Sequence, residues 1–535
     1  MAHRVLSRES ANDRRPSGFS SAMSHVDGDR VAVTQQSSLV ASLWPARESV
    51  VGVFALTLAA ALVMRYSGLF VSVIDWDESL YALMADRWLS GGLPYDAVWD
   101  QHSVGLPALF ALVLSVFPKS IVALRLSACV AVAVTSTTLV FAVRMIDRRW
   151  IVSLVVAILY IGWTSRLWGL AANTEIYLNA LIAPAMLLVM RDIVAPDRRG
   201  HLMRVAVGAL LFGVALQIKH VAVAETTLFL GALTIVSLRR GDALRTGALA
   251  IGCIALPTLV VFGYFLANGL AGEYVRAVIG ANLVYAANRP PLGEILSAFP
   301  RSVVLPLVIG GAGIVAIAVR PDRLRLLLAA WAVAAAIDVA LPGQFWPHYF
   351  LLAAPPAALL AGILVAQARV RWSGLRAAVA VAVAALLTNP IGIVKDGLKI
   401  HALGEADTPR TVAERIGSQL GPEDSIFVFN YQPVVYFLSD ANLPTRHVFP
   451  ADWSQRFLAV TGLDPLREIE SVFARNPKYV VFVEPDWLLM GDDSFASLRR
   501  HLAAYTKSFE VIDRQLLPQP VPVQVYRRND AMPQG

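Results

Sequence analysis

Residues 50–70 read VVGVFALTLAAALVMRYSGLF, and this stretch sets the class of fold because Arg65 is its only charge. An apolar run of about 20 residues is long enough to cross a bilayer as a helix. Ten further apolar runs begin near residues 120, 150, 178, 204, 221, 245, 301, 324, 348 and 375. The sequence therefore predicts an α-helical polytopic membrane protein with about eleven spans.

The composition of the whole chain agrees with this class. Of its 535 residues, 56% are hydrophobic and 16% are charged, whereas soluble proteins carry about 25% charged residues. The net charge of +7 would also suit a nucleic-acid partner. However, the arginines lie in short clusters between the apolar runs, which is typical of cytoplasmic loops. We therefore expect the lipid bilayer, and no nucleic acid, as the partner of this surface.

The polar breaks between the runs alternate in character, and this alternation predicts the orientation. The breaks at 71–119, 169–177, 269–300 and 342–347 are poor in Arg and Lys and are expected outside. The arginine-rich breaks are expected in the cytoplasm; they contain Arg144/Arg148/Arg149, Arg191/Arg198/Arg199/Arg204, Arg239/Arg240/Arg245, Arg320/Arg323/Arg325 and Arg369/Arg371/Arg376. The N-terminus of this predicted plasma-membrane (inner-membrane) protein is then inside and its C-terminal region outside.

Three segments flank or interrupt the predicted transmembrane domain, residues 48–399. Residues 1–47 are polar and arginine-rich, without the apolar core of a signal peptide, so we expect a disordered cytoplasmic tail. Gly105 to Pro118 is apolar but only about fourteen residues long, which suits a re-entrant or interfacial half-helix. Residues 400–535 mix charge with short β-rich runs and are expected to form a small exterior α/β domain.

Alternating elements define the expected α/β domain and a partly parallel sheet. The expected strands are Ser425–Asn430, Val434–Leu438, Tyr479–Val483 and Val521–Tyr526, and the expected helices are Thr411–Leu420, Pro465–Asn476 and Ser494–Tyr505. The domain contains no phosphate-binding glycine loop, metal-ligand spacing or nucleophile elbow. A role as a lid or acceptor-binding element and a role in plain structural support both remain open.

The first exterior loop holds Asp75, Asp77 and Glu78 directly after a span. One interpretation is structural: Asp75 is the N-cap of a helix and Glu78 completes a capping box, which also suits the helix dipole. That interpretation does not require Asp77. Three acids close together near a low-dielectric boundary repel one another, which is costly unless the protein uses them. The loop ends with Asp100 and His102, which either line a site or simply cap the following half-helix.

Other ionisable residues lie near the predicted exterior ends of the spans. Glu175 is the only acid of the second exterior loop, and a carboxylate at that depth is costly unless it is paired, hydrated or functional. Lys219 and Arg166 could neutralise a phosphate, and Arg289 in the long third loop suits an anionic headgroup. The same region contains Arg276, His220, Glu225, Asp338, His348 and Tyr349. Solvated arginines, charge partners and an interfacial aromatic belt are the structural alternatives.

Taken together, the order and spacing of these residues resemble those of a known protein family. Asp77-Glu78 after the first span, then Tyr81, Ala85, Gly92, Pro94-Tyr95 and Asp100 ahead of an apolar half-helix, resemble the first exterior loop of bacterial GT-C glycosyltransferases. The resemblance is to the protein mannosyltransferase-like and lipid A aminoarabinose transferase-like group. It extends to Thr174-Glu175, Lys219 and His348-Tyr349 with Pro355, and loosely covers most of residues 48–400.

The resemblance implies a glycosyltransferase that moves a sugar from a polyprenyl phosphate to a lipid, glycan or protein acceptor on the outer face, with inversion. It implies Asp77 as the base, with Glu78 or Glu175 orienting the acceptor or stabilising positive charge. Lys219, Arg289 and Arg166 are expected to bind the donor phosphate. Substrate contacts are expected from Tyr81, Asp100, His102, His348 and Tyr349. The scheme requires neither a metal ion nor a cofactor.

Two other classes of function remain open at this stage. A transporter or flippase for a lipid-linked or anionic solute would share the spans and the polar residues, although it would more often show interrupted spans at the midplane. A non-catalytic assembly protein would act through its C-terminal domain. Replacement of Asp77 by Asn separates the classes, because a transporter or scaffold should tolerate it far better than a transferase.

Overall fold

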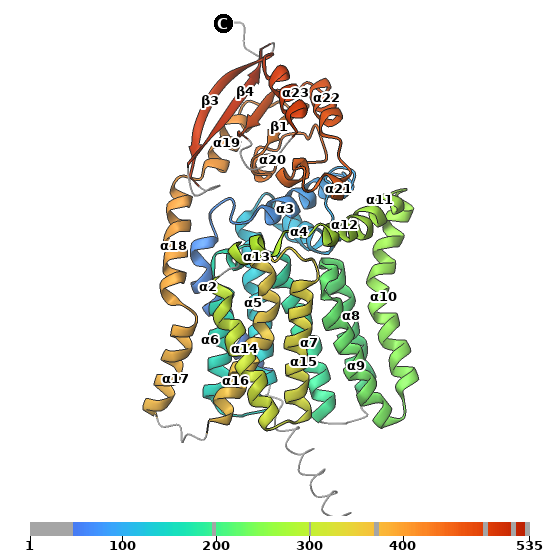
Figure 1. The fold of residues 1–535 in the computed structure, drawn as a ribbon, viewed down its shortest axis with the longest axis vertical. Helices are drawn as coiled ribbons and strands as arrows, with labels where there is room; N and C mark the ends of the chain where they lie inside the picture. Colours follow the sequence, from blue (N-terminus) through green and yellow to red (C-terminus); the bar gives the residue numbers. More distant parts are fainter. Residues whose placement is uncertain are drawn as a thin grey trace, which may run out of the picture. The chain divides into compact units, whose positions relative to one another are not determined.

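The computed structural model describes residues 47–194, 200–298, 301–368, 374–484, 491–514 and 520–529. The predicted tail, 1–47, lies outside these ranges except for its last residue. Figure 1 shows a bundle of long helices with a smaller α/β region at one end. We call this end of the bundle the sheet end and the opposite one the arginine end.

Each of the eleven apolar runs forms a helix, and one more helix of the bundle, residues 390–405, follows the last run. The bundle helices are α2 (Arg47–Arg65), α5 (Ile121–Arg144), α6 (Trp150–Trp163), α7 (Thr174–Val194), α8 (His201–Ile218), α9 (Val223–Arg240), α10 (Ala243–Ala267), α14 (Arg301–Val319), α15 (Arg323–Ala340), α16 (Ala354–Gln367), α17 (Gly374–Leu387) and α18 (Pro390–Glu405). Short 3-10 segments continue some of them: η1 (Tyr66–Gly68), η2 (Leu167–Leu170), η3 (His220–Ala222) and η5 (Pro347–Ala353).

Seven of the described helices are long and apolar enough to cross a membrane, or eight if α17 and α18, which meet at a bend of 46°, count as one span. Helices α6 and α14 are apolar but shorter, and α15 carries three charged residues among its eighteen. The protein is therefore built for a membrane, whereas the count of eleven spans stays a prediction.

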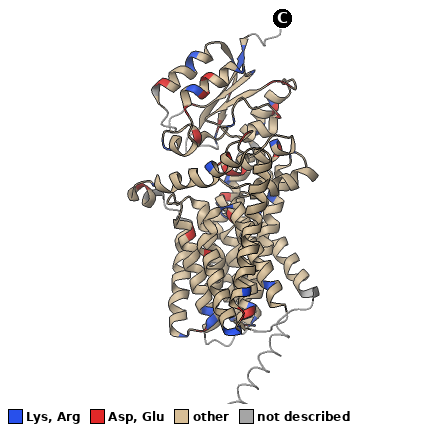
Figure 2. Ribbon diagram, turned by 90° about the vertical axis from the view of Figure 1, so that its right-hand side faces the viewer, with Lys and Arg blue, Asp and Glu red and all other residues tan. Residues whose placement is uncertain are grey.

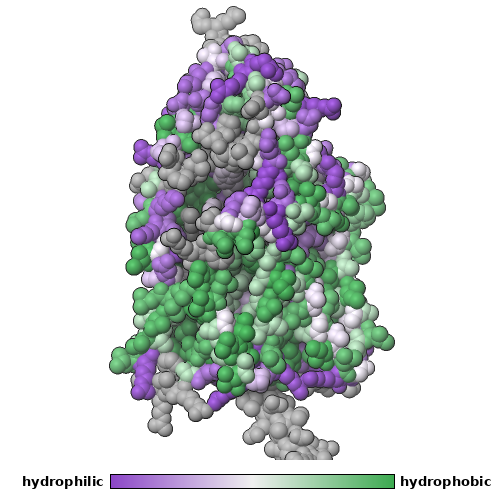
Figure 3. All heavy atoms as spheres, viewed as in Figure 1, coloured by the Kyte–Doolittle hydropathy of each residue, from purple (hydrophilic) through white to green (hydrophobic). Residues whose placement is uncertain are grey.

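Charge and hydropathy are segregated along the bundle. Figure 3 shows apolar side chains over the visible face of the bundle, with hydrophilic residues at its lower rim and over the α/β region. Lys and Arg gather at the arginine end, opposite the α/β region (Figure 2). The described arginines of the predicted cytoplasmic clusters thus share one end of the molecule, as the predicted alternation of the loops requires. Arg198, Arg199, Arg369 and Arg371 lie outside the described residues.

The first predicted exterior loop forms two short helices at the sheet end, α3 (Trp76–Leu89) and α4 (Gly105–Val116) (Figure 1). Helix α4 is twelve residues long, so the half-helix predicted at Gly105–Pro118 is confirmed as a short helix. Helix α3 ends at Leu89, and Gly91 follows with a φ of 94°, in the left-handed region that glycine tolerates. A methyl group on Gly105 would collide with the backbone carbonyl of Gln217, so a glycine is needed for α4 to approach α8 this closely.

The third predicted exterior loop is also helical. It contains α11 (Ala271–Val275), the π-helical turn η4 (Arg276–Ala281), α12 (Asn282–Ala287) and α13 (Leu292–Ala298). Tyr95 and Trp99 of the first loop share a buried aromatic cluster with Phe265, Tyr274 and Tyr285. The first and third loops therefore form one packed layer at the sheet end.

The C-terminal region folds around a four-stranded sheet of order β1-β2-β4-β3. Strands β1 (Ile426–Phe429) and β2 (Tyr479–Phe482) are parallel, and β4 (Val521–Arg528) is antiparallel to both β2 and β3 (Tyr505–Asp513), so the partly parallel sheet is confirmed. The helices of this region are α19 (Thr408–Gly417), α20 (Val434–Ser439), η6 (Pro450–Trp453), α21 (Leu458–Thr461), α22 (Pro465–Ala474) and α23 (Asp492–Leu502).

One strand prediction in this region was wrong, and one strand was missed. Residues 434–438 form helix α20 because Pro433 begins a turn after Asn430, which has a φ of 56° and ends β1. The apolar run VVYFL is buried on several sides, and periodicity cannot separate a short buried helix from a buried strand. Strand β3 was missed because it is half exposed and carries charged residues.

Candidate functional site

The site is built at the start of α3, where the three acids of the first loop take different positions. Asp75 is the N-cap, and its Oδ1 accepts the backbone N–H of Asp77 at 3.3 Å. Its Oδ2 accepts a hydrogen bond from Asn173 Nδ2 at 2.9 Å and lies 3.5 Å from His348 Nδ1. Asp77 Oδ2 lies 3.8 Å from His348 Nε2. The capping role predicted for Asp75 is therefore confirmed, and it leaves Asp77 free of that role.

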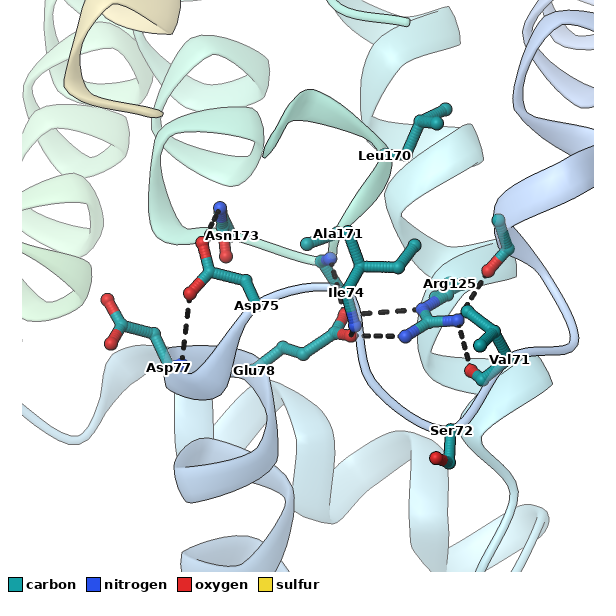
Figure 4. A network of polar contacts seen from close by, with 12 residues as sticks. Val71, Ser72, Ile74, Asp75, Asp77, Glu78, Arg125, Leu170, Ala171 and Asn173 are labelled. Atoms are coloured by element: carbon teal, nitrogen blue, oxygen red, sulfur yellow. Dashed lines mark hydrogen bonds and ion pairs between the residues drawn. The ribbon is translucent and has the colours of Figure 1, made fainter. Parts of the chain in front are cut away.

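Glu78 points away from Asp77 and toward α5 (Figure 4). It forms a buried ion pair with Arg125, whose Nε donates to Glu78 Oε2 at 3.3 Å. The two Glu78 oxygens also accept the backbone N–H groups of Ile74 and Ala172 at 3.1 and 2.9 Å. The predicted capping box is therefore wrong, because Glu78 accepts the N–H of Ile74 and not that of the N-cap residue Asp75. Asp77 and Glu78 are adjacent in the sequence but have different surroundings, because Arg125 neutralises the charge of Glu78 and not that of Asp77.

A second buried ion pair approaches Asp77 from the membrane bundle. Lys219 Nζ lies 2.7 Å from Glu175 Oε1, and both side chains are almost fully buried. Lys219 is in an extended conformation at the break between α8 and η3. Its ammonium group also lies 3.9 Å from the centre of the Tyr349 ring, which is a cation–π contact. The break in the helix therefore turns a cation toward the acids of the first loop.

The third side of the site comes from the turn that leads into α4. His102 Nδ1 lies 3.0 Å from Asp100 Oδ1 and 3.3 Å from the Tyr81 hydroxyl. Asn282 of α12 donates to the carbonyl of Gln101 at 2.6 Å, which fixes this turn to the third loop. The structure thus brings together eight of the eleven predicted site residues: Asp77, Glu175, Lys219, Tyr81, Asp100, His102, His348 and Tyr349.

Burial and the neighbouring charges set the protonation of the two central acids. Desolvation raises the pKa of Asp77 to about 6, and the positive charges of His102 and Lys219 oppose this shift. Desolvation also raises the pKa of Asp75 to about 6, with the Asp77 carboxylate adding to the shift. The Asp77 side chain is 27% exposed, against 7% for Glu78 and 0% for Glu175. Asp77 is therefore the accessible acid of the three, and it titrates in the range useful for proton transfer.

The remaining two predicted cations have other partners. Arg166 Nε lies 2.8 Å from Asp396 Oδ2 of α18, so it links η2 to the last bundle helix. Arg289 donates its Nε–H to the carbonyl of Ala286 at 3.0 Å, on an exposed turn after α12. Within the described ranges, no group of three His, Cys, Asp or Glu residues is arranged to hold a metal ion.

Sequence reasoning missed four residues that build the site. Arg125 neutralises Glu78, and Arg65 donates to the carbonyls of Thr164, Leu170 and Ala171, which shapes the second loop. Asn173 orients Asp75, and the Tyr285 hydroxyl lies 3.3 Å from that of Tyr349. A signal existed for the two arginines, because charges inside apolar runs are costly and mark functional or structural sites.

The arrangement of the elements is shared with solved structures. ArnT from Cupriavidus metallidurans bound to undecaprenyl phosphate superposes with a TM-score of 0.57 at 15% identity, over 90% of this chain and 99% of that one. The apo form gives 0.55 and 16%, over 91% and 100% of the two chains. The fold is that of ArnT. The resemblance to GT-C proteins expected from the first loop is thereby confirmed at the level of the fold.

Weaker similarity extends to the archaeal oligosaccharyltransferase AglB from Archaeoglobus fulgidus, in a complex with an inhibitory peptide and a dolichol-phosphate. That structure gives a TM-score of 0.48 at 13% identity, over 92% of this chain and 76% of that one. No protein-family model and no curated protein sequence matches the chain. The shared architecture with ArnT, at this low identity, establishes the fold alone.

Proposed function

We propose that the protein is a membrane glycosyltransferase that transfers a sugar from a polyprenyl-phosphate donor to a hydroxyl group of an acceptor, with inversion and on the outer face. The observation that carries the proposal is the contrast among the acids. Glu78 and Glu175 are each neutralised by a buried cation, whereas Asp77 is partly exposed beside His348. A single accessible carboxylate next to a buried ammonium group suits a base and a phosphate site.

The reaction uses the groups in the following way. The acceptor oxygen attacks the anomeric carbon, and its proton passes to the Asp77 carboxylate. The bond between the anomeric carbon and the phosphate oxygen breaks, and the phosphate leaves with the bonding electrons. Lys219 stabilises the negative charge that develops there, and such electrostatic stabilisation is usually the largest catalytic contribution. Glu175 holds Lys219 in place, and Tyr81, Asp100, His102, His348 and Tyr349 line the substrate space.

An apolar groove beside the site supports a lipid-linked substrate. It runs between α6, α14, α16 and α17. Its lining is mostly apolar, with Trp163, Val303, Pro306, Ala357 and Leu387 among its members, and it also includes Arg166, Thr388 and Asn389. Pro347 and Phe350 also line it, on either side of His348 and Tyr349. A prenyl chain in this groove would have its phosphate end next to the polar groups. ArnT is solved with bound undecaprenyl phosphate, which belongs to the class of lipid phosphates that the proposed reaction would release.

The test is transfer of label from a panel of radiolabelled polyprenyl-phosphate sugars into membranes that contain the wild type, Asp77→Asn or Asp96→Asn at equal expression. Asp96 is an exposed acid of the same loop and serves as the matched control. Transfer by the wild type and Asp96→Asn, with a loss of about 10²- to 10⁴-fold for Asp77→Asn, supports the proposal, and the active donor names the sugar. Equal transfer by all three proteins would remove Asp77 as the base.

A further inference from the structure

A segment of the C-terminal region, Arg446–Phe457, reaches the loops that surround the proposed site. Its first part is attached to the turn that carries Asp100 and His102. The carbonyl of Arg446 accepts the backbone N–H of Trp99 at 3.0 Å, and Arg446 Nη1 donates to the carbonyl of Tyr95 at 3.1 Å. The ring of His447 lies 5.6 Å from that of Trp99. We call residues 99–102 the first wall of the site.

The last part of the segment is attached to the opposite side. Arg456 Nη2 donates to Gln344 Oε1 at 2.6 Å, and its carbonyl accepts a hydrogen bond from Asn288 Nδ2. Phe457 stacks on Tyr285, with ring centres 5.8 Å apart and planes 23° apart. We call residues 285–288, with Gln344, the second wall. It leads directly to the site, because the Tyr285 hydroxyl meets that of Tyr349, the residue under Lys219.

The middle of the segment lies over the start of α3 and is anchored to the sheet. The ring of Phe449 contacts Trp76, the residue before Asp77, in an edge-on arrangement with centres 6.2 Å apart. Trp453 is buried and donates its Nε1–H to the carbonyl of His447 at 3.0 Å. The same Trp453 ring packs against Phe427 and Phe429 of β1. The segment is thus a continuous link from the sheet to both walls and to the first turn of α3.

From these contacts we propose that Arg446–Phe457 is a roof over the site that fixes the separation of the two walls, and so positions the acceptor between Asp77 and the donor. The proposal rests on the proposed transferase function for what it positions. The walls and Asp77 come from separate parts of the chain, and a displacement of about 1 Å in a reacting group lowers rates by about 10²-fold. The roof residues are positioning residues, since they act through Asp100, His102, Tyr285 and Tyr349.

The experiment compares Phe457→Ala and Arg456→Gln with the control Arg467→Gln in the full-length protein in lipid nanodiscs. Arg467 belongs to the same region, but its side chain is 88% exposed and pairs with Asp464, the N-cap of its own helix α22. The roof predicts a fall in kcat of about 10- to 100-fold for the first two variants, a raised KM for the acceptor and an unchanged thermal midpoint. Arg456→Lys should restore part of the rate because it keeps a donor to Gln344.

A second measurement separates this proposal from the proposed function. Amide hydrogen exchange should become faster in residues 99–102 and 285–288 of Phe457→Ala, while Arg467→Gln leaves both walls protected. If the wild type transfers no sugar but the walls lose protection in Phe457→Ala, the roof stands and the transferase assignment fails. If Phe457→Ala and Arg456→Gln match Arg467→Gln in both wall exchange and acceptor KM, the roof is refuted.

Discussion

The two ends of the bundle bury charge in different ways. At the arginine end, Asp192 is 1% exposed and is surrounded by His201 Nδ1 at 2.9 Å, Arg204 Nη2 at 2.6 Å and Arg240 Nη2 at 3.8 Å. At the sheet end, Asp77 shares His348 with Asp75 and is the most exposed acid of its cluster. A buried carboxylate with three basic partners, such as Asp192, holds helices together. An accessible carboxylate with a single basic partner, such as Asp77, can exchange a proton. Burial of charge alone therefore does not identify a catalytic site in a membrane protein.

The largest effect should come from Lys219→Met. We expect transfer to fall by about 10²- to 10³-fold, because the departing phosphate loses its cation. The variant also leaves Glu175 buried and unpaired, which costs about 3–5 kcal/mol of stability. The double variant Lys219→Met with Glu175→Gln removes that charge, so its thermal midpoint should recover while its activity should not. Recovery of both would mean that Lys219 serves only the fold.

At the arginine end, loss of the acid should lower stability and leave activity unchanged. Asp192→Asn leaves Arg204 and Arg240 without their carboxylate, and we expect a loss of about 3–5 kcal/mol in the free energy of unfolding. The kcat per folded molecule and the KM for the donor should stay at the wild-type values. Thermal unfolding in detergent and steady-state kinetics on the same preparation measure both quantities. A changed KM at constant stability would break the comparison between the two ends.

The pH dependence should report the acids of the sheet end. The pKa values of Asp75 and Asp77 are raised to about 6 by burial, and the base must be ionised to act. We therefore expect kcat/KM to fall about tenfold per pH unit below a midpoint near 6. A raised pKa also means that the folded protein binds protons at Asp75 and Asp77 more tightly than the unfolded chain does. The stability that results is complete below about pH 3.8 and is lost as the pH rises through 6. A flat activity profile from pH 5 to pH 7 would contradict this assignment.

The smallest effect should come from Arg166→Gln. Its partner is Asp396, and a partly exposed ion pair contributes about 0–1 kcal/mol. We expect a slight loss of stability and a change in transfer of less than about twofold. Arg166 also lines the groove proposed for the prenyl chain, but its guanidinium is paired with Asp396, so competition by undecaprenyl phosphate should show an unchanged inhibition constant. Weaker binding of that lipid would return Arg166 to the phosphate site that its sequence position suggested.

Local sequence patterns predicted the membrane class, the helices and the sharing of one end by the arginine clusters. These features depend on composition and period, because a long apolar run has few stable alternatives to a spanning helix. The same patterns predicted the cap at Asp75, since it follows from backbone chemistry. Local pattern failed at residues 434–438, where burial on several sides removes the periodicity that separates helix from strand.

The sequence by itself placed an acidic cluster after the first span and Lys219 near the exterior end of another span. Only the tertiary structure decided which acid stays available, because that depends on residues far along the chain. Arg125 neutralises Glu78 across 47 positions, and Lys219 neutralises Glu175 across 44. The roof is likewise a tertiary feature: Arg456 meets Gln344 across 112 positions. Charges interact through space with little regard to sequence distance, so no local pattern could have assigned these pairs.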